Sequence, residues 1–371
     1  MSVFSKSLKP TGKEIRKIPK KKSDKETICI PSSGHADSHT NVTGPDRPEE
    51  KPDKKSRRTE SRNKRSVKRL LPFRKDLQTH PKTCIIDVGG GLRGIYAAGV
   101  LDRLLDEQVE VDLCIGVSAG SANLATYIAK QKGRCYTYYH DYGFRKEYAS
   151  VSNFLKKRAF FDMDYIYGTL SNQGGEYPID YPVIASSRTE LVSVATNALS
   201  GKPVYFTKNR VRQNDYSVMK GSCAVPYLCH TWNVAGVPFC DGTVSDPIPI
   251  QKALELGAER IVILFPRRPE LLEKDKWSER MLEILERTSA YGRTFPNVSK
   301  ALRQRNNVNN RSFRLAKKLE EEGKLLFVCA EHLYDVKSLG ASPDNVDRLY
   351  RLGYEDGLKA AAFLQKPAAA S

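Results

Sequence analysis

The pentapeptide Gly-Val-Ser-Ala-Gly at residues 116–120 has the composition of a nucleophile-bearing turn. It follows an apolar stretch and precedes a run with helical apolar spacing. The pattern Gly-x-Ser-x-Gly is typical of a serine that stands on a sharp strand-to-helix turn, where Gly116 and Gly120 let neighbouring backbone pass close by. Ser118 is therefore the candidate nucleophile of an acyl transfer.

Three consecutive glycines, Gly89, Gly90 and Gly91, end an earlier apolar stretch and precede Leu92 and Arg93. Because no Cβ hinders approach, such a turn exposes backbone N–H groups. The tetrahedral intermediate of acyl transfer carries an oxyanion, and one donor placed for it is worth roughly 2.7–4 kcal/mol. Consecutive parallel strands are usually neighbours, so the turn is expected to face the candidate nucleophile.

The same glycines also satisfy Gly-x-Gly-x-x-Gly, with Gly94 as the last member, which is the fingerprint of a dinucleotide site. That fingerprint expects an acidic residue at the end of the second strand. Here the second apolar stretch ends in Val117 and Ser118, and its acid, Asp112, lies at the opposite end. The pattern therefore favours the oxyanion interpretation.

A serine nucleophile needs a base, and Asp241 is the main candidate. It follows Phe239 and Cys240 and precedes Gly242, so a turn presents its carboxylate beside apolar neighbours that would raise its pKa. Asp-Gly also makes tight turns for purely structural reasons. A triad in the order Ser118, Asp241, His332, as in α/β-hydrolases, is a second arrangement compatible with the sequence.

Apolar stretches alternate with helical patterns from residue 83 onward, which predicts an α/β fold with a mainly parallel sheet sandwiched by helices. The expected strands are 83–88, 111–117, 181–187, 190–198, a hairpin within 233–242, 260–265 and 325–330. The expected helices are 92–107, 119–131, 215–223, 249–258, 271–290, 297–306, 310–322 and 343–365. We expect a catalytic domain at 81–268 and a mostly helical C-terminal extension at 269–371.

The positive charge is concentrated at the N-terminus. Residues 1–82 carry 23 Lys and Arg against 10 Asp and Glu, which is +13 of the net +18. Residues 1–80 are therefore expected to be a disordered basic tail that contacts an anionic membrane or only aids solubility. No specific nucleic acid is expected as a partner.

Other features of the sequence limit the cellular compartment and the cofactors that we expect. No apolar run approaches the roughly 18 residues of a membrane span, and the N-terminus lacks the apolar core of a signal peptide. The eight cysteines are dispersed, as is typical of buried thiols in a reducing compartment. Without Cys-x-x-Cys or His-Glu-x-x-His, no metal or other cofactor is expected. We therefore expect a cytoplasmic protein with peripheral membrane contact.

Three segments together resemble the patatin-like phospholipases. These are Gly-Gly-Gly-Leu-Arg-Gly at 89–94, Gly-Val-Ser-Ala-Gly at 116–120 and Asp-Gly at 241–242. The similarity extends over about 83–365 and is greatest to bacterial members with a helical C-terminal extension. It implies a three-layer fold and a Ser–Asp dyad.

Carried over residue by residue, the resemblance makes Ser118 the nucleophile and Asp241 the base. The amides around Gly90, Gly91 and Leu92, with the Arg93 loop, would form the oxyanion hole. The expected function is hydrolysis of a phospholipid or other lipid ester through an acyl-enzyme. The alternative is a non-catalytic protein that binds lipid or nucleic acid through its basic tail.

Overall fold

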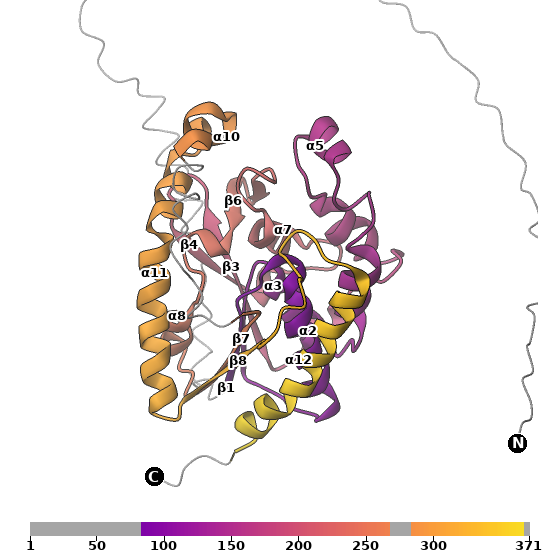
Figure 1. Cartoon of the computed structure of the whole chain (residues 1–371), viewed down its shortest axis with the longest axis vertical. Coiled ribbons are helices and arrows are strands. Elements are labelled where there is room, and N and C mark those ends of the chain that lie inside the picture. Colours follow the sequence, from indigo (N-terminus) through magenta and orange to yellow (C-terminus); the bar gives the residue numbers. More distant parts are fainter. Residues whose placement is uncertain (1–82, 268–282, 367–371) are drawn as a thin grey trace, which may run out of the picture. The chain divides into compact units, whose positions relative to one another are not determined.

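The computed structural model describes residues 83–267 and 283–366 (Figure 1). The expected basic tail and most of the helix expected at 271–290 lie outside these ranges. Within them, no helix is both long enough and apolar enough to cross a bilayer.

One eight-stranded sheet forms the centre of the described structure, in the order β5-β6-β3-β2-β1-β7-β8, with β4 paired to β3. The parallel strands are β1 (Thr83–Asp87), β2 (Leu113–Val117), β3 (Glu190–Asn197), β7 (Arg260–Phe265) and β8 (Leu325–Cys329). The antiparallel strands are β4 (Pro203–Thr207), β5 (Trp232–Val234) and β6 (Val237–Asp241). The expected hairpin is the pair β5 and β6, and it adds antiparallel strands to a largely parallel sheet.

Helices cover both faces of this sheet, because side chains of each buried strand alternate between two cores. On one face, Ile85 and Cys114 pack with helices α2 (Ile95–Asp106), α3 (Ala119–Ile128) and α12 (Pro343–Leu364). On the other face, Ile86 and Ile115 pack with α8 (Ile250–Glu255) and α11 (Pro296–Glu321). Figure 1 shows α11 and α12 on opposite sides of the strands. The predicted α/β class with two helical layers is confirmed.

Short helices complete the described chain. They are α4 (Arg134–Thr137), α5 (Val151–Lys157), α6 (Tyr181–Ser186), α7 (Ser217–Cys223), α10 (Ala290–Thr294), and the single turns or π-helical segments η1 (Gly91–Gly94), η2 (Tyr138–Tyr142), η3 (Tyr165–Leu170), η4 (Lys208–Arg210) and η5 (Gly242–Val244).

Two local expectations are wrong. Residues 181–187, expected as a strand, form α6, because the Asp180 side chain accepts the Val183 N–H as an N-cap and Pro182 suits the first turn. The two helices expected at 297–306 and 310–322 are one helix, α11. The asparagine-rich centre of α11 has modest helix propensity, but one face of the helix stays packed on the sheet, and tertiary packing outweighs propensity.

The C-terminal elements belong to the same sheet and cores. β8 pairs in parallel with β7, and α12 lies along α2. The phenol of Tyr96 on α2 donates to Asp356 Oδ2 on α12 at 2.8 Å. The division into a catalytic domain and an extension remains a prediction, and in the structure the extension supplies an edge strand and a covering helix.

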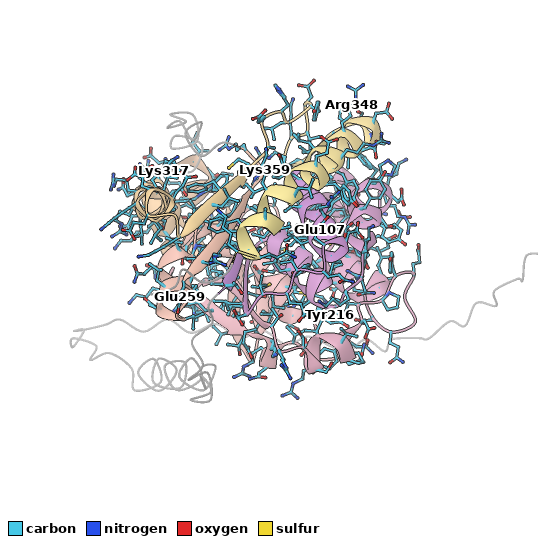
Figure 2. The ribbon with its side chains drawn as sticks, turned by 90° about the horizontal axis from the view of Figure 1, so that it is seen from below. Glu107, Tyr216, Glu259, Lys317, Arg348 and Lys359 are labelled. Carbon is cyan, nitrogen blue, oxygen red and sulfur yellow. The ribbon has the colours of Figure 1, made fainter. Side chains whose placement is uncertain are left out.

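Gly353→Ala is expected to lower the free energy of unfolding by about 3 kcal/mol, because α12 crosses α2 without room for a side chain. A Cβ at position 353 would lie 2.0 Å from the Tyr96 carbonyl oxygen. Thermal denaturation should show a loss of roughly 6–12 °C. The matched control is Arg348→Ala on the exposed face of α12 (Figure 2), which should shift the midpoint by about 2 °C or less. Equal midpoints for both variants would contradict the close approach.

Candidate active site

Ser118 stands between the end of β2 and the first residue of α3, in a backbone conformation that L-residues rarely adopt. Its φ is 55° and its ψ is −131°, a strain that costs on the order of 1–3 kcal/mol. The space for this turn depends on Gly116 and Gly120, and a Cβ on Gly120 would lie 2.3 Å from the Asp87 carbonyl oxygen. The sequence therefore folds into the sharp turn that the pentapeptide predicts.

Ser222, on α7, fixes the Ser118 backbone through a hydrogen bond. Its Oγ accepts the Ser118 N–H at 3.0 Å and donates to the Val194 carbonyl at 2.7 Å. Ser121 Oγ lies 2.9 Å from the same hydroxyl. Sequence analysis missed Ser222, because a serine 104 residues from Ser118 carries no local signal.

Asp241 ends β6 and reaches Ser118 across the end of β3, which lies between β6 and β2. Ser118 Oγ donates to Asp241 Oδ2 at 2.7 Å, and Oδ1 accepts the Thr243 N–H at 2.8 Å. Gly242, the next residue, lies so close to β3 that a Cβ would come 2.3 Å from the Val194 carbonyl oxygen. Both carboxylate oxygens are thus held in fixed directions.

The pair is largely shielded from solvent. Ser118 is 8% exposed and Asp241 is 2% exposed. Burial raises the pKa of the Asp241 carboxyl, while the hydrogen bonds from Ser118 and Thr243 oppose part of that rise. A carboxylate with a raised pKa is a stronger base than an exposed aspartate, so this one is suited to take a hydroxyl proton.

The triple-glycine turn faces Ser118, as the adjacency of β1 and β2 requires. Gly89 has φ 71°, and a Cβ there would lie 2.4 Å from the Val117 carbonyl oxygen and 3.1 Å from Ser118 Cβ. Only glycine fits this position, because both its conformation and the contact exclude a side chain.

The amides of the turn differ in their availability. The Gly89 N–H donates to Asp87 Oδ1 at 2.9 Å, and the Leu92 N–H donates to the Ser338 carbonyl at 3.1 Å. Within the described residues, the N–H groups of Gly90 and Gly91 have no hydrogen-bond partner. Two of the five residues expected to form the oxyanion hole, Gly90 and Gly91, therefore have free amides, while those of Gly89 and Leu92 are occupied.

Asp87 and Asn123 stabilise the glycine turn through hydrogen bonds, and the sequence analysis predicted neither residue. Asn123 Nδ2, on α3, donates to Asp87 Oδ2 at 2.9 Å and to the Gly94 carbonyl at 3.1 Å. Burial raises the pKa of Asp87 to about 6, against the hydrogen bonds from Gly89 and Asn123. The two side chains therefore connect the glycine turn after β1 to α3, the helix that follows Ser118.

Arginines give the site a positive field. Burial and the charge of Arg267 lower the pKa of Arg93, and burial and the charge of Arg305 lower the pKa of Arg267. Arg305 also acts on Asp241, where its charge lowers the pKa. Arg93 Nη2 donates to Ser338 Oγ at 2.5 Å, while its buried Nε has no partner in the described structure. This arrangement favours an anionic group beside the dyad.

A cavity of about 680 Å³ adjoins Arg93 and contains His332 in its wall, together with Tyr334, Lys337 and Ser338. The hydrogen bonds of Ser118 and Asp241 among the described residues involve no histidine. The structure thus brings Ser118, Asp241 and the glycine turn together and leaves His332 in the cavity wall. No group of three His, Cys, Asp or Glu in 83–267 or 283–366 is arranged to hold a metal.

A family model described as patatin-like phospholipase matches residues 88–254. This part of the chain is therefore similar to the patatin-like phospholipases. The match confirms the predicted resemblance over these residues, which contain the glycine turn, Ser118 and Asp241. A second model, described as a domain of unknown function (DUF6363), matches residues 295–366, which contain α11, β8 and α12.

Individual relatives of the patatin-like domain are distant. The chain is 27% identical over 205 residues to the uncharacterized protein YjjU of Escherichia coli (strain K12), which covers 54% of this chain and 56% of that protein. It thus spans about half the length of this curated relative. Among solved structures, VipD from Legionella pneumophila has a TM-score of 0.37 and 11% identity, covering 76% of this chain and 67% of that one.

Proposed function

We propose that the protein is a serine lipid acyl hydrolase of the phospholipase A or esterase type, in which Ser118 is the nucleophile and Asp241 the base. The observation that carries this proposal is the 2.7 Å hydrogen bond from Ser118 Oγ to Asp241 Oδ2 within a buried site. The amides of Gly90 and Gly91 are the proposed oxyanion donors, because they follow Gly89, which packs against Ser118, and have no hydrogen-bond partner among the described residues.

The reaction follows from these positions. Asp241 accepts the hydroxyl proton as Ser118 Oγ attacks the ester carbonyl, and the carbonyl oxygen becomes an oxyanion that the two glycine amides stabilise. Collapse of this intermediate breaks the ester C–O bond, and the leaving alcohol takes the proton from Asp241. Water then attacks the acyl-enzyme, Asp241 accepts a water proton, and Ser118 regains its proton as the fatty acid leaves.

The substrate we propose is a phospholipid or other lipid ester. The field of Arg93, Arg267 and Arg305 supports an ester with an anionic group near the scissile bond. Contact of the basic tail with an anionic membrane, and a cytoplasmic location, remain predictions.

A fluorophosphonate probe tests the reaction class and the nucleophile together. Phosphonylation of an activated serine forms an O–P bond and expels fluoride, so mass spectrometry should find the adduct on the peptide that contains Ser118. Ser118→Ala should remove the adduct, whereas Ser121→Ala, which changes a neighbouring serine, should retain it. An adduct on another residue, or none on the folded protein, would contradict the proposal.

The pH dependence should follow the protonation of two buried carboxyls. Asp241 acts as a base only when ionised, and because burial raises its pKa, kcat/KM should fall with decreasing pH at a higher pH than it would with an exposed aspartate. Protonation of Asp87, whose pKa is raised to about 6, should weaken its hydrogen bond from the Gly89 N–H as the pH falls through that value. Initial rates on a short-chain ester from pH 4.5 to 8 measure this acid limb of the pH profile, the fall of kcat/KM with decreasing pH.

A matched control for the pH profile is Asp246→Asn. The pKa of Asp246 is also raised to about 6 by burial, but its Oδ2 accepts from Tyr205 rather than from Ser118. This variant should leave the acid limb in place. A rate that does not fall between pH 7 and the lowest pH at which the protein stays folded would rule out Asp241 as the base.

A further inference from the structure

The surface around α5 exposes large apolar side chains. Val151 is 67% exposed, Phe154 47% and Leu155 76%, and Phe144 just before the helix is also exposed. Four of the eight exposed large hydrophobic residues of the described structure therefore fall within residues 144–155. Positions 151, 154 and 155 have i, i+3, i+4 spacing, so they share one face of the helix.

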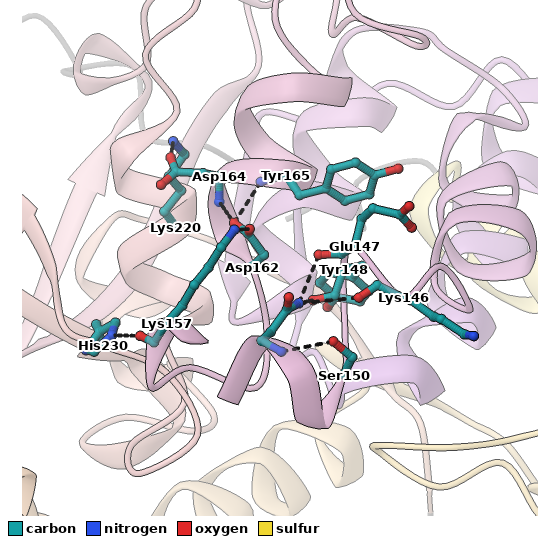
Figure 3. Close-up of polar contacts among 11 residues, drawn as sticks. Lys146, Glu147, Tyr148, Ser150, Lys157, Asp162, Asp164, Tyr165, Lys220 and His230 are labelled. Carbon is teal, nitrogen blue, oxygen red and sulfur yellow. Dashed lines mark hydrogen bonds and ion pairs between the residues drawn. The ribbon is translucent and has the colours of Figure 1, made fainter. Parts of the chain in front are cut away.

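This helix is held outward by polar contacts at its base (Figure 3). Ser150 Oγ caps the helix by accepting the Asn153 N–H at 3.1 Å, and Asn153 Nδ2 donates to the Glu147 carbonyl at 3.0 Å. Lys157 pairs with Asp162, and its carbonyl contacts His230. The apolar face thus belongs to a braced hairpin, residues 144–162, and not to a loosely attached segment.

Basic residues flank the apolar positions in the sequence. Residues 144–158 contain one acid, Glu147, and five basic residues: Arg145, Lys146, Lys156, Lys157 and Arg158. Arg145 pairs with Glu176 and Lys157 with Asp162. Lys146, Lys156 and Arg158 are exposed and take part in none of the ion pairs found among the described residues. An exposed apolar face with exposed cations just before and after it in the chain complements an anionic, apolar surface.

The hairpin is also joined to the proposed active site. The Phe160 N–H donates to the Leu228 carbonyl at 2.7 Å, and Phe161 packs with Cys223 and Ala224. The Ala224 carbonyl in turn accepts the N–H of Asp241 at 2.9 Å. Figure 1 shows α5 at the end of the molecule beyond β6, the strand that ends in Asp241. A surface bound at α5 would therefore lie at the end of the sheet that carries the dyad.

We propose that the apolar face of α5 docks the protein onto the surface of an anionic phospholipid bilayer. The proposal rests on the proposed function insofar as the bilayer supplies the lipid ester. A bilayer fits this face better than a second copy does, because a stable protein interface buries about 800 Å² per partner. A helix of seven residues is only about 10 Å long, and insertion among lipids needs no matching shape.

Insertion is measured locally with Phe154→Trp in the full-length chain. Vesicles of phosphatidylglycerol and phosphatidylcholine with brominated acyl chains should quench the emission of the new tryptophan, beyond any quenching of the two native tryptophans in the wild type. The matched control is Leu358→Trp, at a 46% exposed apolar position on α12. It should show no added quenching, even if the basic tail holds both variants on the vesicles.

Hydrolysis provides the second measurement. The double variant Phe154→Ser, Leu155→Ser should hydrolyse phospholipid vesicles about tenfold more slowly, because two membrane-facing apolar side chains are lost. Hydrolysis of a water-soluble short-chain ester should stay within about twofold of the wild type, since neither residue contacts the dyad. An unchanged thermal midpoint excludes misfolding. Lys146→Glu with Lys156→Glu should weaken vesicle quenching of the Phe154→Trp protein, most strongly at low salt.

The outcomes separate the two proposals. If the wild type hydrolyses neither substrate, the proposed function fails, while tryptophan quenching still decides the docking. Vesicle hydrolysis unaffected by the double variant, or equal quenching of the α5 and α12 tryptophans, would overturn the docking surface. Sedimentation of the wild type as a dimer that the double variant dissociates would also overturn it, in favour of contact between copies.

Discussion

Ser118→Ala is expected to abolish ester hydrolysis, with a loss in kcat of about 10⁴-fold to 10⁶-fold. The change removes only the attacking oxygen, because alanine keeps the Cβ and the backbone N–H that donates to Ser222. The thermal midpoint should therefore remain close to that of the wild type. Rates are measured on a short-chain ester and on phospholipid vesicles.

A Ser118→Ala protein that retains hydrolysis within about tenfold of the wild type would exclude this nucleophile. If in addition no substrate is turned over by the wild type, the alternative of a non-catalytic binding protein would gain support. Under that alternative, deletion of residues 1–80 abolishes binding to polyanions or anionic vesicles. Under the enzymatic proposal, the same deletion leaves hydrolysis of a soluble ester intact.

Asp241→Asn is the second large effect, and we expect a loss in kcat of about 10⁴-fold. Asparagine has nearly the same shape, and its carbonyl oxygen retains the contact with the Thr243 N–H. It has no affinity for the Ser118 proton at neutral pH, and no histidine bonded to the dyad is present among the described residues to replace it. The measurement is kcat on the short-chain ester, beside the thermal midpoint.

Three comparisons make this result specific. Asp246→Asn removes another buried carboxylate and should cost about tenfold or less. The double variant Ser118→Ala, Asp241→Asn should be no slower than either single variant, because groups that act as a unit are not additive. His332→Ala should also cost less than about tenfold. A loss for His332→Ala that matches the loss for Asp241→Asn would instead favour the triad.

Much of the fold is determined by the sequence itself. Continuous apolar stretches such as residues 260–265 indicate strands buried on both faces, and helical spacing between them indicates covering helices. The strand-to-helix turn at Ser118 is also indicated locally, because the two glycines that it requires, Gly116 and Gly120, lie within two residues of the serine. The assignment of residues 181–187 failed because the N-cap at Asp180 outweighs a strand-like composition.

The composition of the site is decided by tertiary structure. Nothing near Asp241 in the sequence indicates that β3 lies between β6 and β2, and this strand order brings a carboxylate within 2.7 Å of a hydroxyl 123 residues away. Tertiary contacts also decide which backbone amides of the glycine turn are free. Asp87 occupies the N–H of Gly89 and Ser338 that of Leu92, so Gly90 and Gly91 remain free.

The physical reason is a difference in range. Side-chain periodicity and turn sterics act within a few residues, so a sequence displays them directly. Strand order, the support of Ser118 by Ser222, and the gathering of Arg93, Arg267 and Arg305 result from packing between segments far apart in the chain. The sequence alone therefore indicates a nucleophile, a base and a glycine turn, and the packed sheet decides that they meet.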